Sequence, residues 1–164
     1  MELSTLKGLY LQELKDLYSA ETQILKALPK MVKAASNEKL ATGFRKHLEQ
    51  TKDHATRLEE ILQDQGETTH GPKCHGMEGV LKEGDEMIAA TGDEEVRDAG
   101  LISAARRVEH YEMAGYGCVV EYATLLGETK AAKLLQRTLD EEEETNEKLT
   151  ELAASVINLS ALAA

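Results

Sequence analysis

The sequence predicts an all-α protein, a four-helix bundle in which one of the connections is long. Apolar residues recur every three or four positions over long stretches, as on the buried face of an amphipathic helix. Ala, Leu, Glu and Lys are abundant, whereas the 164 residues include only two prolines, one phenylalanine and no tryptophan. A chain of this length suits one domain, so we expect a single domain over residues 1–164.

The first two helices are expected to form an antiparallel hairpin. Helical spacing of apolar residues extends over 4–35, where Pro29 indicates either a kink or an earlier end of the helix. Ser36 or Asn37 can cap the second helix, which then continues to Gly66. Because only a few residues join the two helices, we expect them to fold back on each other.

The remainder of the chain predicts a long crossover and a second hairpin. Glycine and proline mark 66–76 as a loop, and a short helix is expected over 77–90. Long helices are expected over 94–126 and 130–157, while 158–164 have the character of a frayed tail. Two hairpins joined by one long crossover are the connectivity of ferritin-like four-helix bundles.

Composition argues against several classes of protein. The chain carries 19 basic and 30 acidic residues, for a formal net charge of −11, whereas nucleic-acid binding relies on clustered Lys and Arg. No apolar run approaches the ~20 residues that span a bilayer, and the first residues lack the basic flank and apolar core of a signal peptide. The two cysteines are too few for a disulfide scaffold. We therefore expect a cytoplasmic protein without nucleic-acid or membrane partners.

Five ionisable residues interrupt the apolar faces of the four long helices. Helical spacing puts each of them on the core-facing stripe, within about three residues of the middle of its helix, or roughly 5 Å at ~1.5 Å per residue. The centres of antiparallel helices are level with one another, so these side chains should converge on one slab of the interior. They are Glu21, His54, Glu109, Glu112 and Glu142.

A simpler interpretation exists for each of these glutamates taken alone. With 30 acidic residues in the chain, some will fall on an apolar stripe by chance, and a phase error of one residue would move Glu109 to the surface. The coincidence of four helices at one level favours the buried cluster. Tyr116, like the other tyrosines, is expected to fill the core or an interface; as the alternative, its place four residues after Glu112 would let it donate a hydrogen bond to a carboxylate of the cluster.

A buried group of carboxylates predicts bound metal. An ionised carboxylate is heavily penalised in a low-dielectric interior, and several together repel one another. Two divalent or trivalent cations would remove the repulsion, and a set of oxygen and nitrogen ligands suits Fe or Mn. We therefore predict a dimetal centre in which carboxylates can bridge the two ions and His54 supplies a terminal nitrogen.

Several stretches match a known family in the same order along the chain. They are Asp16–Gln23, Ser36–Leu40, His47–Thr51, Met77–Gly79, Val108–Glu112 with Tyr116 and Gly117, and Ala131–Leu135 continuing to Lys148–Thr150. On these stretches the sequence resembles the YciE/YciF family of bacterial stress-associated ferritin-like proteins over nearly its whole length. The resemblance implies a ferritin-like bundle and a homodimer, in a family whose biochemical activity is poorly defined.

The third-helix pair Glu109 and Glu112 is similar to the Glu-x-x-Glu of rubrerythrin-type dimetal proteins. That likeness assigns Glu21, His54 and Glu142 as the ligands from the other three helices. The sequence departs from the superfamily pattern at two positions, because Glu is expected at Thr51 and His at Thr145. Gln50 and Asn146 are neutral oxygen donors that could substitute. A weaker, single-metal or degenerate site is therefore the alternative.

These inferences predict a stress-associated protein with a dimetal centre. Iron is the expected metal, with Mn as the alternative, and the centre would act on peroxide or dioxygen or would handle iron. The alternative from a different class is a non-catalytic helical dimer whose central cluster is an inherited, inactive site. An iron store is a weaker hypothesis, since assembly into a shell cannot be read from one chain.

Two cysteines and two histidines suggest other sites. His70, Cys74 and His75 in the crossover are residue types that bind zinc, but their spacing matches no common zinc motif and a surface loop is the simpler interpretation. Cys118 falls in an apolar part of the third long helix and is expected to be a small core residue.

Overall fold

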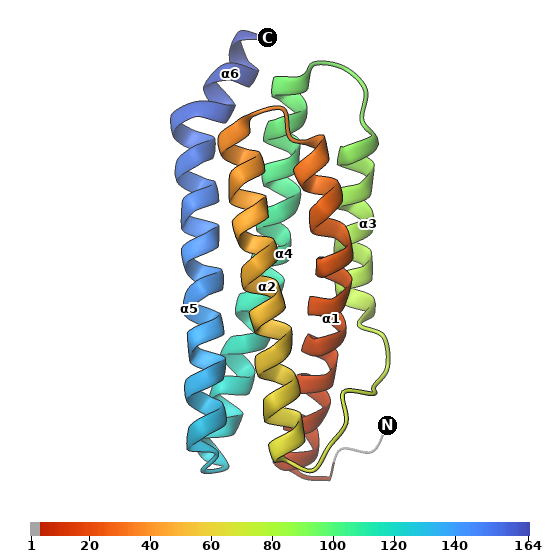
Figure 1. The fold of residues 1–164 in the computed structure, drawn as a ribbon, viewed down its shortest axis with the longest axis vertical. Helices are drawn as coiled ribbons and strands as arrows, with labels where there is room; N and C mark the ends of the chain where they lie inside the picture. The colour runs from red at the N-terminus through yellow and green to blue at the C-terminus, as the bar shows by residue number, and fades with distance from the viewer. Residues whose placement is uncertain (1–3) are drawn as a thin grey trace.

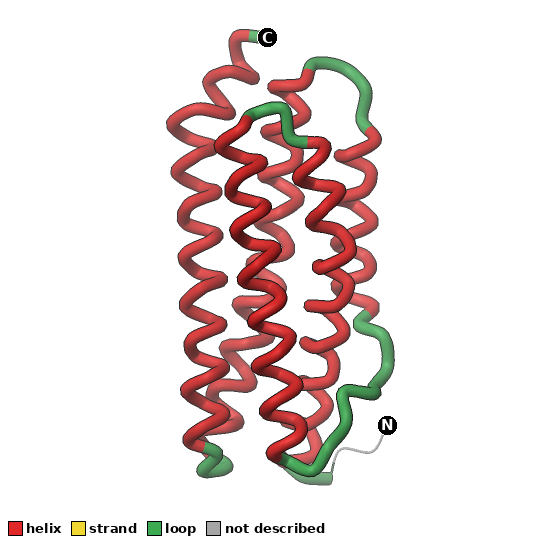
Figure 2. The backbone as a smooth tube through the Cα atoms, in the orientation of Figure 1, coloured by secondary structure: helices red, strands yellow, loops and turns green. Residues whose placement is uncertain are grey.

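The structure, a computed structural model, describes residues 4–164, and nearly all of them are helical (Figures 1 and 2). Four long helices run along the molecule, and three shorter segments complete it. The long helices are α1 (Leu6–Ala34), α2 (Glu38–Asp64), α4 (Glu94–Leu125) and α5 (Thr129–Leu152), and the shorter segments are α3 (His75–Ala89), η1 (Ala153–Ile157) and α6 (Asn158–Ala163). The predicted four-helix bundle is confirmed.

The helices are arranged as two antiparallel hairpins with an outer crossover. α1 pairs with α2 and α4 pairs with α5, while α1 also contacts α4 and α2 contacts α5, which closes the bundle. From the end of α2 a loop, green in Figure 2, runs along the outside of the bundle to α3. α3 then packs against α1 and α4. The long crossover that carries a short extra helix is thus confirmed.

The ends of the helices follow ordinary capping chemistry. Asn37 caps α2, because its side chain accepts hydrogen bonds from the backbone N–H groups of Lys39 and Leu40. Gly66 follows the end of α2 with a φ of 71°, the left-handed conformation that glycine adopts readily. Pro29 does not end the first helix, since α1 continues to Ala34.

The C-terminal end differs from the prediction. The residues after Ile157 were expected to fray, but α5 passes through one turn of π-helix into α6, and Asn158–Ala163 are helical. Ile157 is buried in the apolar core beside Leu149 and Ala153, and α6 contacts α4. These contacts hold the last turns against the bundle, so the expectation of a frayed tail was wrong.

The apolar core is divided into two clusters by a polar layer. One cluster contains Ile24, Phe44, Val108 and Leu149, one from each long helix, at the end of the α1–α2 turn. The other lies at the opposite end and contains Leu17, Leu58, Tyr116 and Leu135, again one from each long helix. Between these two clusters, every long helix buries at least one polar or charged residue. These polar and charged residues form the candidate site.

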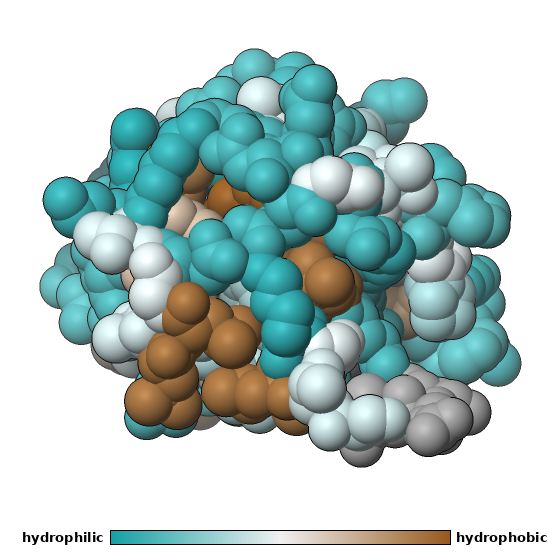
Figure 3. Space-filling view, turned by 90° about the horizontal axis from the view of Figure 1, so that it is seen from below, coloured by the Kyte–Doolittle hydropathy of each residue, from teal (hydrophilic) through white to brown (hydrophobic). Residues whose placement is uncertain are grey.

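The surface is mainly hydrophilic, with local apolar exposure. Figure 3 views the end of the bundle where α4 turns into α5, and hydrophobic residues gather along one edge of it. Leu6, at the start of α1, and Leu125, at the end of α4, are exposed apolar side chains there. None of the helices in the described part of the chain combines the length and apolar content needed to span a bilayer.

Candidate metal centre

Six buried side chains from the four long helices converge in the polar layer. His47, Glu109, Glu112 and Glu142 form one group, in which each residue offers a ligand atom within 4.8 Å of the others. Glu21 and His54 form a second group of the same dimensions that also includes Glu142. The carboxylate of Glu142 therefore belongs to both groups, and the two candidate sites are adjacent.

The distances between the side chains define the centre of the cluster. Nδ1 of His54 lies 2.8 Å from Oε1 of Glu142 and 3.5 Å from Oε1 of Glu21. Nε2 of His47 lies 3.4 Å from Oε1 of Glu109 and 3.8 Å from Oε2 of Glu142. Both imidazoles thus face carboxylates contributed by other helices.

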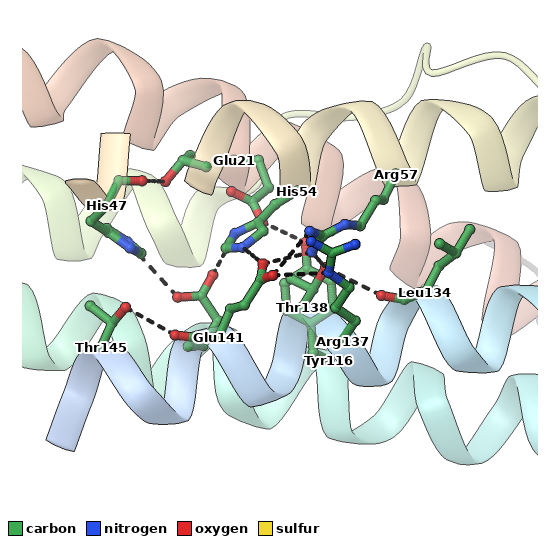
Figure 4. Close-up of polar contacts among 12 residues, drawn as sticks. Glu21, His47, His54, Arg57, Tyr116, Leu134, Arg137, Thr138, Glu141 and Thr145 are labelled. Atoms are coloured by element: carbon green, nitrogen blue, oxygen red, sulfur yellow. Dashed lines mark hydrogen bonds and ion pairs between the residues drawn. The ribbon is translucent and has the colours of Figure 1, made fainter. Parts of the chain in front are cut away.

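A second carboxylate holds His54 from its other side. Nε2 of His54 lies 2.9 Å from Oε2 of Glu141, which also accepts a hydrogen bond of 2.7 Å from Arg57 (Figure 4). Arg57 donates further to Oε1 of Glu141 and to the hydroxyl of Thr138, and Arg137 donates to Oε1 of Glu141 from the surface. This network fixes the orientation of the imidazole ring.

Tyr116 orients one of the carboxylates of the cluster. Its fully buried hydroxyl donates a hydrogen bond to Oε1 of Glu21. From the sequence, Tyr116 was expected either to fill the core or to donate a hydrogen bond to a carboxylate of the cluster, and the structure shows that it does both.

Many polar atoms of the cluster lack a hydrogen bond, although some of them face an oppositely charged group. Nine side-chain nitrogen and oxygen atoms of the six residues are buried and have no hydrogen-bond partner within residues 4–164. They include both carboxylate oxygens of Glu112 and both ring nitrogens of His47. Because a buried polar atom without a partner costs roughly 1–3 kcal/mol, so many in one place require a ligand or protonation to offset the cost.

Burial sets the protonation of the metal-free cluster. It raises the pKa of Glu109 and of Glu112 well above the usual range, and repulsion from Glu142 adds to the effect. Burial likewise lowers the pKa of His47 and favours its neutral form. Burial opposes charge on His54 too, but its contacts with Glu142 and Glu21 outweigh that effect and raise its pKa to about 10.

Glu142 is the counter-ion of this imidazolium. Burial raises the pKa of Glu142, but the contacts with His54 and His47 outweigh burial, so the pKa is lowered overall. The metal-free centre therefore holds a His54–Glu142 ion pair among carboxyl groups that retain protons. Binding of cations at these groups would release protons.

The structure brings together five of the six residues singled out from the sequence. Glu21, His54, Glu109, Glu112 and Glu142 are all buried and lie in the two groups. Gln50 is half-buried on α2, and its side chain lines a cavity beside the cluster together with His47 and Glu109. Its role as an oxygen donor stays a prediction.

Sequence reasoning missed two contributors. His47 lies seven residues before His54 on the same face of α2, a spacing that indicates a second inward imidazole. Glu141 belongs to an acidic run, 140–144, of which only Glu142 shares the apolar stripe, so the sequence predicts a solvated side chain for Glu141. It is half-buried and reaches His54 from the side of α5 that faces α2, a contact that depends on the packing of two helices.

The two departures from the superfamily pattern leave visible consequences. The hydroxyls of Thr51 and Thr145 donate to backbone carbonyl oxygens of their own helices, those of His47 and Glu141. Asn146, named as a substitute oxygen donor, instead accepts a hydrogen bond from Arg106. His47, one turn before Thr51 on α2, contributes an imidazole to the cluster.

The crossover residues do not form a site within residues 4–164. His70 and His75 are exposed, and His75 contacts Glu78. Cys74 is buried, caps α3 and shares a hydrogen bond with the hydroxyl of Tyr111. Cys118 is exposed, which corrects its expected place in the core; it lies two residues after buried Tyr116 and so faces outward from α4.

Fold and cluster together define a four-helix bundle with a buried carboxylate–histidine centre. The chain belongs to the family described as Domain of unknown function (DUF892), which matches residues 5–162. Protein YciF of Escherichia coli K12 is 44% identical over 162 residues, which cover 98% of each chain. The resemblance to the YciE/YciF family is thereby confirmed.

Solved structures agree with this assignment. The crystal structure of the E. coli stress protein YciF matches with a TM-score of 0.91 and 44% identity, over 95% of this chain and 99% of that one. YcfI from Rhodopseudomonas palustris, described as a proposed structural protein, matches with a TM-score of 0.87 and 38% identity, over 91% and 95%. A Xanthomonas campestris protein, 19% identical with a TM-score of 0.73 over 93% and 94%, shares the fold.

Proposed function

We propose that this protein is a stress-associated, ferritin-like protein that binds two metal ions in the core of its bundle. The observation that carries the proposal is the convergence of six buried side chains from the four long helices, nine of whose nitrogen and oxygen atoms lack a hydrogen bond. Oxygen and imidazole ligands in this ratio favour iron, with manganese as the alternative. The similarity to the E. coli stress protein YciF supports the stress association.

The two groups divide the ligands between the ions. His47, Glu109 and Glu112 would hold one ion, Glu21 and His54 would hold the other, and Glu142 belongs to both groups. Bound iron would supply redox and Lewis-acid chemistry toward peroxide or dioxygen, or would itself be the species that is handled.

The residues around the ligands have separate tasks. Arg57 and Glu141 keep the His54 ring turned toward the centre, and Tyr116 orients Glu21 by donating to one of its oxygens. The carboxyl groups of Glu109 and Glu112 would give up their protons when cations bind, since burial raises their pKa in the metal-free protein. The apolar clusters on both sides of the layer would limit the access of water.

Metal analysis tests this proposal directly. Protein purified without chelator and reconstituted with Fe²⁺ or Mn²⁺ should retain about two ions per chain after desalting. Glu143→Gln, an exposed substitution beside Glu142, is the matched control and should retain as much metal as the wild type. A wild-type content that stays near zero with both metals would overturn the proposal.

The second candidate function is a non-catalytic, structural stress protein with a degenerate site. It is favoured by Thr51 and Thr145, whose hydroxyls bond to their own helices instead of entering the cluster, and by the description of YcfI as a proposed structural protein. This function predicts negligible metal content with an intact fold. In both functions we propose a cytoplasmic homodimer, which light scattering of the purified protein checks.

A further inference from the structure

A cavity of about 360 Å³ adjoins the candidate metal centre. It lies in the half of the bundle toward the α1–α2 turn, and helices α1 to α5 all line it. Most of the lining side chains are apolar, among them Leu28, Phe44, Leu81 and Leu149. The polar exceptions at its inner end are His47 and Glu109 of the cluster and their neighbours Gln50 and Thr145.

The mouth of the cavity is cationic. Its exposed lining residues include Lys39 and Lys46 on α2 and Lys148 on α5. Two carboxylates lie nearby, but Asp85, at the α3 side of the cavity, forms an ion pair with Lys30, and Glu144 pairs with Lys148. On a chain of net charge −11, a mouth with this surplus of lysines favours an anion over a cation.

We propose that this cavity binds a medium-chain fatty acid, with the hydrocarbon chain inside and the carboxylate at the lysines of the mouth. The apolar walls match a hydrocarbon, since burial of apolar surface is favourable and non-directional. A cavity of about 360 Å³ is large enough for a hydrocarbon chain of medium length. Decanoate carries such a chain.

The charges of the two ends fix the orientation. A carboxylate at the inner end would be buried beside Glu109 and His47 with no lysine near it, and an ionised carboxylate is heavily penalised in a low-dielectric interior. At the mouth the same carboxylate meets Lys39 and Lys46, whereas Lys148 is paired with Glu144. The binding site is defined by the cavity and its mouth, so it is independent of whether the centre holds metal.

Isothermal titration calorimetry of the chelator-treated protein tests the proposal with three probes. Decanoate should bind at least about tenfold more tightly than decyltrimethylammonium, which has the same chain and a cationic head, because of the lysines. It should also bind at least about tenfold more tightly than acetate, which lacks the chain. Equal affinity for the anionic and cationic probes, or no binding of decanoate, would overturn the proposal without affecting the proposed metal centre.

Two variants locate the ligand. Gly84→Leu fills the cavity from α3, where an added Cβ meets only Ala104 at 3.9 Å, and leucine favours a helix over glycine. It should weaken decanoate binding at least about tenfold, with the fold checked by circular dichroism. Lys46→Glu should weaken binding similarly, whereas Lys133→Glu, an equal charge change on exposed α5 surface, should not. Unchanged binding in Gly84→Leu and Lys46→Glu would show that the ligand sits elsewhere and overturn the proposal.

Discussion

Oε1 of Glu142 lies 2.8 Å from Nδ1 of His54 in the middle of the bundle. The other oxygen of this carboxylate lies 3.8 Å from Nε2 of His47, so one side chain of α5 reaches both imidazoles of α2. It is also the member that the two candidate ligand groups have in common. The most damaging single substitution for metal binding should therefore be at Glu142.

Glu142→Gln should remove metal from both positions of the centre. The substitution keeps the shape but removes the charge that faces both ions, and we expect the affinity for Mn²⁺ to fall by at least ~10–100-fold, the loss seen even for residues that only support ligands. Glu21→Gln touches one group and should leave about half of the metal bound. Titration of the apo proteins with Mn²⁺, followed by electron paramagnetic resonance, measures both. Equal losses for the two variants would contradict a shared ligand.

Glu112→Gln should stabilise the metal-free protein near neutral pH. Burial raises the pKa of Glu112 well above the unfolded value of 4.5, so the folded state keeps a proton that the unfolded state releases, and stability falls as the pH rises above that value. Glutamine does not titrate, so the variant should gain on the order of 1 kcal/mol at about pH 7 and little at about pH 4. Urea unfolding in the presence of chelator measures the difference. A gain of the same size at both pH values would contradict this origin.

The position of the cluster along the bundle could be predicted from the sequence. Helix geometry gives both the side of the helix on which a residue lies and its distance along the helix axis. Glu21, Glu112 and Glu142 each fall on an apolar stripe near the centre of a long helix, and the structure brings them together. The same geometry indicates His47, which lies seven residues before His54 on the same face of α2. The metal itself stays a prediction.

The residues that support the ligands could not be predicted in the same way. Glu141 is one residue from Glu142, and it is rotated about 100° from it around the helix, so the pattern of α5 alone places it in solvent. Its contacts with His54 and Arg57 arise where α5 packs against α2. The helix beyond Ile157 also depends on contacts between helices. Ile157 packs in the core and α6 packs against α4, which the sequence of this segment alone does not indicate.

Arg57→Met should destabilise the fold and separate the supporting network from the ligands. Arg57 is 8% exposed and donates to both oxygens of Glu141, so its loss should cost roughly 1–3 kcal/mol. Arg137→Met removes an exposed partner of the same carboxylate and should cost only ~0.2–1 kcal/mol. Denaturant unfolding measures the loss in the free energy of unfolding for each variant. Equal losses would contradict the larger contribution expected of the buried Arg57.

The cost of Arg57→Met should also depend on pH. Burial opposes ionisation of Glu141, but the hydrogen bond from Arg57 leads the contacts that outweigh it and lower the pKa of Glu141 to about 2. A carboxyl with a lowered pKa contributes stability above its unfolded value of 4.5 and loses that contribution as the pH falls through the folded value. The difference in the free energy of unfolding between wild type and Arg57→Met should therefore shrink as the pH falls from 4.5 to about 2.

Tyr116→Phe should weaken metal binding while leaving the fold intact. Burial raises the pKa of Glu21, and the hydroxyl of Tyr116 is among the contacts that oppose this rise. Without that donor Glu21 holds its proton more tightly, and because a ligand must be deprotonated to bind a cation, we expect the affinity for Mn²⁺ to fall ~10–100-fold. The loss should diminish as the pH rises, since deprotonation then becomes easier. Tyr18→Phe, which removes a hydroxyl bonded to exposed Glu59, is the matched control, and equal effects of the two substitutions on Mn²⁺ affinity would show that Tyr116 does not act through Glu21.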